Sequence, residues 1–224
     1  MRKPFLFHPG VPVIIQNDAN VYEGNLDHYF RAIVNEARNL RNPYHDFRHM
    51  LHVTWLCYLS CISYADELDR RQRRNLLIGA LCHDVNHPGT PGDDDLNIIR
   101  AIRWFERHAL DEDKPYMPDI REIMRATEFP HTTATESLEL RCQIIRDADL
   151  AQALDPAWIQ QIVFGLSEEW GKTPLEVLKS QEVFLGNLKF NTAWAQQLYP
   201  QSRIDERILE GRRLVEILTG STSE

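Results

Sequence analysis

The sequence predicts an all-α fold, a compact multi-helix bundle within a single domain. Apolar residues recur at intervals of three and four through most of the chain, which is typical of amphipathic helices. No segment shows the sustained alternation of apolar and polar residues that a half-buried strand needs. The 224 residues, 43% of them hydrophobic and 26% charged, are enough to enclose one well-buried core.

The first element expected is an extended arm over residues 1–20. Three prolines and a glycine fall within its first twelve positions and break any regular pattern. The arm would pack through its VPVII segment, or not at all.

Helical periodicity follows the arm, and the single domain is expected to cover residues 21–219. Turn-forming pairs that end in proline separate the helices, and Thr173-Pro174 opens one of them. Residues 220–224 are expected to be a disordered tail. The expected helices are 26–40, 47–65, 70–84, 94–109, 118–127, 136–151, 156–166, 174–190 and 203–219.

Charge and cysteine content narrow the class of protein. The formal net charge of -8 argues against non-specific binding to nucleic acid or to an anionic membrane, and an anionic substrate would need metal ions. The four cysteines form no CxxC pair, so reduced, buried thiols are expected. The N-terminus has no apolar run suited to a signal peptide or a membrane span. A soluble cytoplasmic protein is predicted.

The segment NPYHDFRH, residues 42–49, carries two histidines four positions apart. On a helix, His45 and His49 would share one face and could both reach one centre. The HDFRH part also resembles the HExxH pattern of zinc proteases, with aspartate in place of glutamate. The shorter Asp46 side chain would sit poorly as a general base, and no third protease ligand stands out, so the protease alternative is the weaker one.

A histidine and an aspartate stand side by side in ALCHDVNHPG, residues 80–89. His83 and Asp84 would diverge by about 100° around a helix, which still lets both reach a metal off the helix end. His87 follows, just before a Pro-Gly stop. Further along, Asp149 interrupts the apolar stretch IIRDADLA, where an unpaired carboxylate would be costly to bury.

Each of these residues also has an ordinary structural explanation. His45 or His49 could be a hydrogen-bonded surface histidine. Asp84 could be a charge at a helix end, and Asp149 a salt-bridge partner of Arg146. Taken together, however, they supply imidazoles and carboxylates in a set that suits a divalent ion with open positions for water and phosphate oxygens.

Five short segments, in order along the chain, resemble motifs of the class I 3′,5′-cyclic nucleotide phosphodiesterases, which belong to the HD-domain metal-dependent phosphohydrolases. The first two matches are specific, the next two are supportive, and the last is short. The segments are NPYHDFRHMLHVTWLCYL, LCHDVNHPG, RATEFPHT, RDADLA and KSQEVFLGNL. The resemblance implies an HD-domain bundle with two divalent metal ions, drawn from zinc, manganese, iron and magnesium.

The resemblance also implies the metal ligands. The first, zinc-preferring ion would be bound by four residues: His49, His83, Asp84 and Asp149. Asp84 would bridge to a second ion, usually magnesium or manganese, held mostly through waters.

Further roles follow from the same resemblance. His87, Thr127 and Glu128 would hold the metal-bound waters in place. His45 would be the general acid that protonates the leaving ribose oxygen. The substrate would contact three side chains, of which the last two would clamp the nucleotide base: Tyr44, Gln181 and Phe184.

Several positions depart from the family pattern. Asp46 replaces the usual asparagine, and Asn86 and Glu128 replace usual aspartates. Only 65 positions separate Asp84 from Asp149, fewer than in the animal enzymes, so helices that help to wall their pocket must be missing.

Other polar residues have less specific interpretations. The GDDD run at 92–95 is expected to be a solvated N-terminal cap for the next helix. His108 and His131 lie where other HD-domain proteins place extra metal ligands. For both, a surface or supporting role is favoured over direct ligation.

The expected function is hydrolysis of a 3′,5′-cyclic nucleotide to the 5′-monophosphate, with a small-molecule phosphoester as substrate. A nucleotide phosphomonoesterase or another HD-domain phosphohydrolase is an alternative, because the metal motifs do not distinguish ring opening from monoester cleavage. A ligand-sensing protein with a degenerate site is another. The base and the oligomeric state, including a homo-oligomer, are left open.

Overall fold

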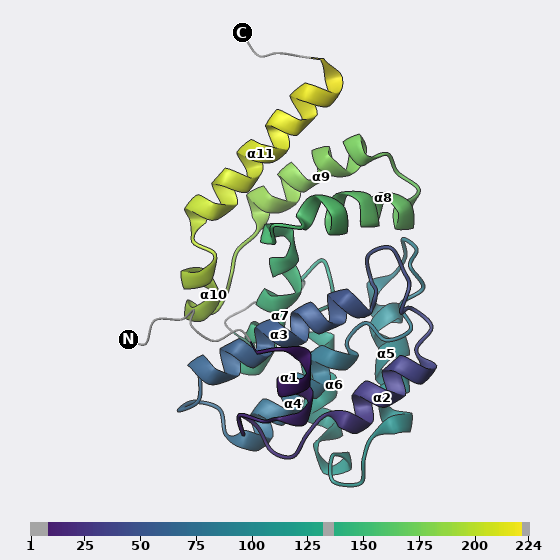
Figure 1. Cartoon of the computed structure of the whole chain (residues 1–224), viewed down its shortest axis with the longest axis vertical. Coiled ribbons are helices and arrows are strands. Elements are labelled where there is room, and N and C mark those ends of the chain that lie inside the picture. Colours follow the sequence, from purple (N-terminus) through teal and green to yellow (C-terminus); the bar gives the residue numbers. More distant parts are fainter. Residues whose placement is uncertain (1–8, 132–136, 221–224) are drawn as a thin grey trace.

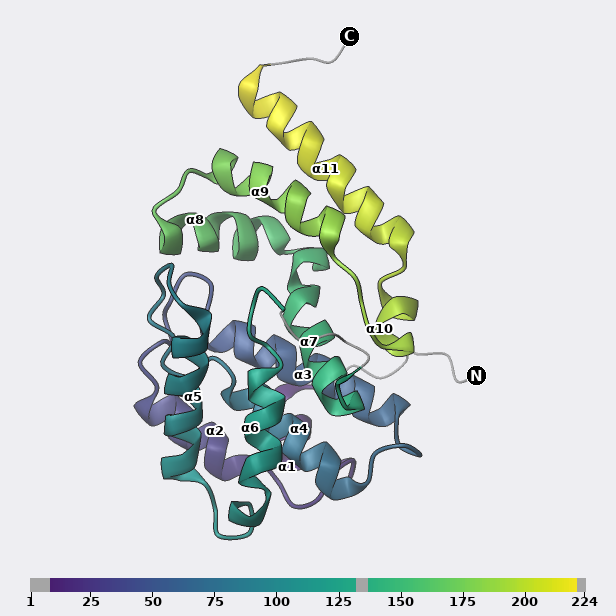
Figure 2. The same cartoon turned by 180° about the vertical axis from the view of Figure 1, so that it is seen from behind.

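The computed structural model describes residues 9–131 and 137–220, and the predicted all-α fold is confirmed over them. Within these ranges the structure has eleven α-helices and no strand. The helices form a larger body and a smaller one, each with its own hydrophobic core. Figure 1 shows α8, α9 and α11 grouped at one end of the molecule, and Figure 2 shows the same grouping from behind.

The larger body contains the helices that carry the predicted metal ligands or immediately precede them. Helices α3, α4, α6 and α7 pack on one another, and Leu56, Leu76, Ile120 and Ile145 are fully buried in its core. Its elements are α1 (Val11–Gln16), α2 (Asp27–Glu36), α3 (Phe47–Ser63), α4 (Arg70–Cys82), α5 (Asp94–His108), η1 (Lys114–Tyr116), α6 (Met117–Arg125), α7 (Leu140–Leu150), η3 (Ala151–Leu154) and α10 (Ala193–Leu198).

The smaller body packs around Trp158. Its elements are the π-helix η4 (Ile159–Phe164), α8 (Gly165–Trp170), α9 (Pro174–Asn187) and α11 (Gln201–Thr219), of which α9 and α11 also reach the larger core through Leu185 and Ile204. Its buried core consists of Trp158, Ile162, Val163, Leu166, Val177 and Leu178, and α11 packs against it through Leu214 and Val215.

Side-chain caps fix where the helices near the site begin. The Asp46 carboxylate accepts a hydrogen bond from the backbone N–H of His49, which starts α3. Asp69 and Gln72 form a reciprocal capping box at the start of α4, and Thr173 opens α9 in the same way. Because Asp46 is a good N-cap, as asparagine also is, its replacement of the family's asparagine has a structural account.

Residues 11–16 of the predicted extended arm form helix α1 instead. Pro12 is tolerated there because N–H groups in the first turn have no intrahelical partner. Ile14 and Ile15 are buried in the larger core, which stabilises this short helix. Residues 1–8 and 221–224 lie outside the described residues, so the rest of the predicted arm and tail, and the domain boundaries, stay predictions.

Some helix boundaries also differ from those predicted. Helix α2 ends at Glu36 because Ala37 is extended, and the chain then turns inward at Asn39. The helix predicted over 156–166 is a π-helix that continues as α8 through Gly165 to Trp170. The six-residue helix α10 was not predicted at all, since so short a segment shows little periodicity.

The four cysteines are free and buried, as predicted. Among the described helices, none combines the length and apolar content that a membrane span requires.

Candidate functional site

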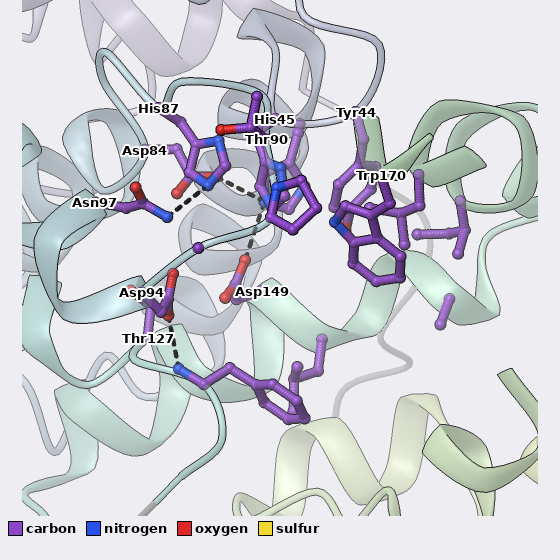
Figure 3. Close-up of a pocket in the computed structure, with 18 of the residues that line it drawn as sticks. Tyr44, His45, Asp84, His87, Thr90, Asp94, Asn97, Thr127, Asp149 and Trp170 are labelled. Atoms are coloured by element: carbon purple, nitrogen blue, oxygen red, sulfur yellow. Dashed lines mark hydrogen bonds and ion pairs between the residues drawn. The ribbon is translucent and has the colours of Figure 1, made fainter. Parts of the chain in front are cut away.

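Most of the predicted site residues line a cavity of about 260 Å³ between the two bodies (Figure 3), and His83 and Glu128 are the exceptions. The larger body contributes the histidines and aspartates of the wall. The smaller body contributes Ile162, Leu166, Trp170, Gln181 and Phe184. The cavity therefore has a polar side and a largely apolar side.

Four side chains converge on the polar side, although they come from separate motifs: His49, His83, Asp84 and Asp149. Nε2 of His49 lies 3.3 Å from Nε2 of His83, 3.3 Å from Oδ2 of Asp84 and 3.0 Å from Oδ1 of Asp149. Nε2 of His83 lies 3.3 Å from Oδ2 of Asp84 and 3.5 Å from Oδ1 of Asp149. Four ligands placed about 2.0–2.2 Å from a tetrahedral zinc ion would be separated by about 3.3–3.6 Å. These five separations are close to that range, and the ligand atoms of His49, His83 and Asp149 all lie within 4.8 Å of one another.

Both imidazoles direct a lone pair at this centre. Nδ1 of His49 lies 2.6 Å from Oε1 of Gln152, whose amide nitrogen donates to Gln161. Nδ1 of His83 lies 2.8 Å from the carbonyl oxygen of Ala80. Because both partners accept, each Nδ1 carries a proton, and in the neutral ring each Nε2 keeps its lone pair. Two lone pairs and two carboxylates then face one another, an arrangement that a cation stabilises.

The electrostatics of the buried groups agree with a site for positive charge. Burial alone would lower the pKa of His83, but the carboxylates of Asp84 and Asp149 raise this pKa well above its ordinary value. Burial would raise the pKa values of Asp84 and Asp149, yet the neighbouring histidines lower both. Positive charge is thus favoured at this point, whether protons or a metal ion supply it.

His45 lies beside this centre and is held by Glu169. Nδ1 of His45 is 2.6 Å from Oε2 of Glu169, while Oε1 accepts the backbone N–H groups of Tyr44 and His45, each at 2.9 Å. Helix α8 can approach this closely because Gly165 has no side chain: a Cβ there would lie 2.8 Å from the carbonyl oxygen of Pro43. Burial acts to lower the pKa of His45, but the hydrogen bond to Glu169 and the nearby carboxylates raise it overall.

The predicted helical pairing of His45 with His49 is wrong. Helix α3 begins at Phe47, so His45 lies in the preceding turn, and its ring centroid is 6.0 Å from that of His49. The Asp46 carboxylate caps α3, which leaves the zinc-protease alternative without its general base.

His87 packs directly on the predicted acid. Its ring stacks on that of His45, with 3.8 Å between centroids. Nδ1 of His87 accepts from the backbone N–H of Gly89, and Nε2 lies 2.9 Å from Nδ2 of Asn97. Burial and the charge of His45 lower the pKa of His87 to about 4, so this ring is neutral near pH 7. Holding a metal-bound water stays a prediction for His87, and the contacts give it a role in positioning His45.

Asparagines connect the two histidine motifs. Nδ2 of Asn39 donates to the carbonyl oxygens of His45 and Asp84, at 2.9 and 2.8 Å, and its Oδ1 accepts from the N–H of Asn86. Asn86 has a φ of 66°, a left-handed conformation that asparagine tolerates better than most residues, and its Oδ1 accepts from the N–H of Arg38. The asparagine at this position, where the family has aspartate, therefore has a backbone role.

Replacing Asn39 with alanine is expected to lower the free energy of unfolding by about 1–3 kcal/mol, because buried carbonyl groups lose their donor. It should also reduce activity, since Asn39 sets the spacing of His45 and Asp84. Urea unfolding followed by circular dichroism would measure the loss. Asn35→Ala, at an exposed position of α2, is the matched control and should change little; equal stability of both variants would contradict the role assigned to Asn39.

The remaining polar residues divide between the cavity wall and other places. Thr127 lines the cavity, and its hydroxyl donates to the carbonyl of Met124. Glu128 is half-buried and is not among the described residues that line the cavity; its carbonyl accepts from Nδ1 of His131. His108 stacks on Trp104 and pairs with Glu36, which is a structural contact.

The predicted capping role of the GDDD run is only partly confirmed. The Asp93 side chain accepts from the N–H of Asp95 and caps α5. Asp94, in contrast, lines the cavity, and its Oδ2 accepts from the N–H of Phe129 at 2.7 Å. Burial raises the pKa of Asp94, and the nearby carboxylates of Asp84 and Asp149 add to that rise.

The predicted base-contact residues line the same cavity. Gln181 is 7% exposed, and its Oε1 has no hydrogen-bond partner among the described residues. The half-buried ring of Phe184 lies 6.0 Å from that of Phe129. Tyr44 packs against His49 with 5.0 Å between ring centroids, and burial raises its pKa well above the ordinary value.

Beyond the aromatic residues the space continues into an adjoining cavity of about 570 Å³. The two cavities share Phe129, Leu150, Trp170, Gln181 and Phe184. The adjoining cavity is lined by Arg146 and Lys189 as well, so cationic side chains lie beyond the apolar side.

Four residues that build the site were not predicted from the sequence: Asn39, Asp94, Gln152 and Glu169. Asn39 and Gln152 carry no unusual local pattern, and the carboxylate of Glu169 in LSEEWGK looks like one on an exposed helix face. A weak signal existed for Asp94, because three consecutive aspartates exceed what a single cap needs.

Comparison with known proteins agrees with the motifs in the first part of the chain. The family model for 3′5′-cyclic nucleotide phosphodiesterase matches residues 44–93, which contain His45, His49, His83, Asp84 and His87. A search of curated proteins finds no match. Over residues 44–93 the chain is therefore a match to the 3′5′-cyclic nucleotide phosphodiesterase family, and the resemblance predicted from its motifs is confirmed there.

Proposed function

We propose that this protein is a two-metal phosphohydrolase that opens a 3′,5′-cyclic nucleotide to the 5′-monophosphate. The observation that carries the proposal is the convergence of four side chains: Nε2 of His49 and Nε2 of His83 each lie 3.0–3.5 Å from the carboxylates of Asp84 and Asp149. These side chains lie beside a histidine that is paired with a buried glutamate. The family match over residues 44–93 supports a phosphodiesterase-like phosphohydrolase.

The donor set fits a divalent ion at His49, His83, Asp84 and Asp149, drawn from zinc, manganese, iron and magnesium. When bound, divalent ions would supply an activated water and neutralise charge on the phosphoryl oxygens. Gln152 and the carbonyl of Ala80 hold the two imidazoles in the tautomer that this role requires.

His45 is the residue that would protonate the leaving ribose oxygen. Its Nδ1 is committed to Glu169, which leaves Nε2 as the nitrogen that can face the substrate. The Glu169 side chain is fully buried and favours the protonated ring, so it prepares His45 to act as an acid. The stacked His87 ring limits how far His45 can rotate.

The apolar side of the cavity would receive the nucleoside. Phe184 and Trp170 offer ring faces, and Gln181 lines the same wall with an amide whose Oε1 is buried without a partner among the described residues. Rotation of this amide would bring its donor or its acceptor to the base. Because an amide can present either its donor or its acceptor, this contact does not choose between adenine and guanine.

Gln181→Ala is expected to lower kcat/KM for a cyclic nucleotide about tenfold, the value of roughly one hydrogen bond in a buried site. It should leave bis(p-nitrophenyl) phosphate, which has no base, almost unaffected. Lys179→Ala, at an exposed position of the same helix, is the control. Equal losses on both substrates would show that Gln181 acts structurally.

One substrate panel tests the proposed function against its alternatives. Metal-replete protein is incubated with 3′,5′-cyclic AMP, 3′,5′-cyclic GMP and nucleoside monophosphates, in Mn²⁺ and after chelation. Chelator-sensitive formation of 5′-monophosphates from the cyclic substrates supports the proposal. Release of phosphate from monophosphates alone would favour a phosphomonoesterase, and binding without turnover would favour a ligand sensor.

We also place the enzyme in the cytoplasm, acting on a small-molecule nucleotide. The support is the set of free, buried cysteines, which is typical of a reducing compartment. A homo-oligomer is compatible with this proposal.

A further inference from the structure

Asp94 is a cavity residue to which neither the motifs nor the family match gives a role. It is the first residue of α5, and its neighbour Asp93 supplies the cap of that helix. The N–H of Phe129 fixes Oδ2 of Asp94 at 2.7 Å. Figure 3 shows Asp94 among the side chains around the cavity that Asp149 also lines. The side chain is thus oriented without being used by the cap.

Asp94 changes the net charge of the cavity. Asp84, Asp94 and Asp149 all line it. His45 is offset by Glu169, and the buried Nε2 atoms of His49 and His83 face each other and the carboxylates of Asp84 and Asp149, an arrangement that a cation stabilises. With a single divalent ion bound, the three carboxylates would still leave the cavity with one net negative charge. A site for an anionic phosphate would then repel its substrate.

A second divalent ion would reverse that sign. Hard cations such as Mg²⁺ and Mn²⁺ prefer carboxylate and water oxygens, and they commonly use only one or two carboxylates from the protein. Asp84 and Asp94 can provide these carboxylates from opposite ends of the segment that joins α4 to α5, with the Thr127 and Asn97 side chains on the same part of the wall.

We propose that Asp94, together with Asp84, holds the second divalent cation of this site, directly or through water. The inference rests on the proposed two-metal function, in which the family resemblance assigned only Asp84 to that ion. Asp94 would take the place of a carboxylate from the Glu128 position, because Glu128 does not line the described cavity. The bond from Phe129 then serves to fix the carboxylate toward the ion.

Asp94→Asn is the direct test, since the amide keeps the shape and its oxygen can still accept from Phe129. Asp95→Asn is the matched control, one residue along the same helix, half-buried and paired with Arg125 rather than facing the cavity. The Mn²⁺ stoichiometry and affinity of both variants are measured by electron paramagnetic resonance on metal-stripped protein. We expect Asp94→Asn to keep one tight equivalent and to weaken the second at least about tenfold. Two unchanged equivalents would overturn the proposal.

Thermal unfolding separates metal binding from a structural role. If Asp94 holds a cation, removing its charge relieves repulsion, so the metal-free variant should have a Tm equal to or above that of the parent. Its gain in Tm on adding Mn²⁺ should be smaller. A lower metal-free Tm with an unchanged gain would show that Asp94 is structural. Because neither readout uses a substrate, a loss of the second Mn²⁺ equivalent would stand even if the substrate panel refuted the proposed activity.

Discussion

Asp149→Asn is expected to abolish tight metal binding and to lower phosphodiester hydrolysis about 100-fold or more. Oδ1 of Asp149 is 3.0 Å from Nε2 of His49 and 3.5 Å from Nε2 of His83, so it completes the donor set. A neutral amide lacks the charge that favours a dication. Substituting a residue that only holds a metal ligand in place commonly lowers metal affinity or activity 10–100-fold, and loss of a ligand itself should cost more. Metal content by elemental analysis and steady-state kinetics would measure both losses.

The same substitution should also lower the stability of the metal-free protein, because the histidines lower the pKa of Asp149 and its charged carboxylate therefore stabilises the fold. Metal content is accordingly measured on protein that circular dichroism shows to be folded. Metal content equal to that of the parent would contradict the assignment of Asp149 as a ligand.

Asp147 offers a control on the same helix. Its carboxylate accepts four hydrogen bonds from Asn191 and Thr192, each at 2.8 Å, and burial raises its pKa to about 6. Asp147→Asn should cost about 1–3 kcal/mol of stability, because an amide cannot accept all of these bonds. Its metal content should stay at the level of the parent.

The candidate metal ligands could be predicted from the sequence because burying a polar side chain without a partner costs free energy. His83, Asp84 and Asp149 interrupt apolar stretches, and such a departure from local preference needs a partner that repays burial. Their order along the chain was enough to predict one centre, and the structure brings their donor atoms together. The all-α fold was predictable for a related reason, since helical periodicity is carried by many residues at once.

The supporting residues could not be predicted in the same way. Glu169 reaches His45 from 124 positions away, and only the packing of α8 on the turn before α3 decides that its carboxylate faces inward. Asn39 follows α2 in a loop, where asparagine is common for local reasons. Its contacts with His45 and Asp84 depend on two loops that meet only in the folded chain.

The aspartate run shows where local rules stop. Any of the three aspartates at the start of α5 could cap the helix, and the prediction that one of them does so is confirmed for Asp93. Which of the others turns inward depends on how α5 packs against α4 and α6. Asp95 instead lies at the surface near Arg125.

His45→Ala is expected to lower kcat for a cyclic nucleotide about 10²–10⁴-fold, the range typical of a lost general acid. Metal content should survive, because Nδ1 of His45 is held by Glu169 and its ring centroid is 6.0 Å from that of His49. Kinetics and elemental analysis on the same preparation would show the split. If metal is lost along with activity, the separation between acid and ligand is wrong.

A substrate with a good leaving group isolates the proton transfer. The p-nitrophenolate ion leaves without protonation, whereas a ribose alkoxide does not. His45→Ala should therefore lose far less activity on bis(p-nitrophenyl) phosphate than on a cyclic nucleotide. Equal losses on the two substrates would assign His45 to binding or structure.

Glu169→Gln tests the same step through its pH dependence. The acid works only when protonated, so activity falls as the pH rises through the pKa of His45. Glu169 raises that pKa, and a neutral glutamine would remove this effect and face Nδ1 with a less suitable partner. The alkaline limb of the kcat profile should therefore move to lower pH, while the loss below that limb stays smaller than for His45→Ala. An unmoved limb would mean that another group sets it, and Glu169 would then be an anchor for the turn at Tyr44 and His45 through their backbone N–H groups alone.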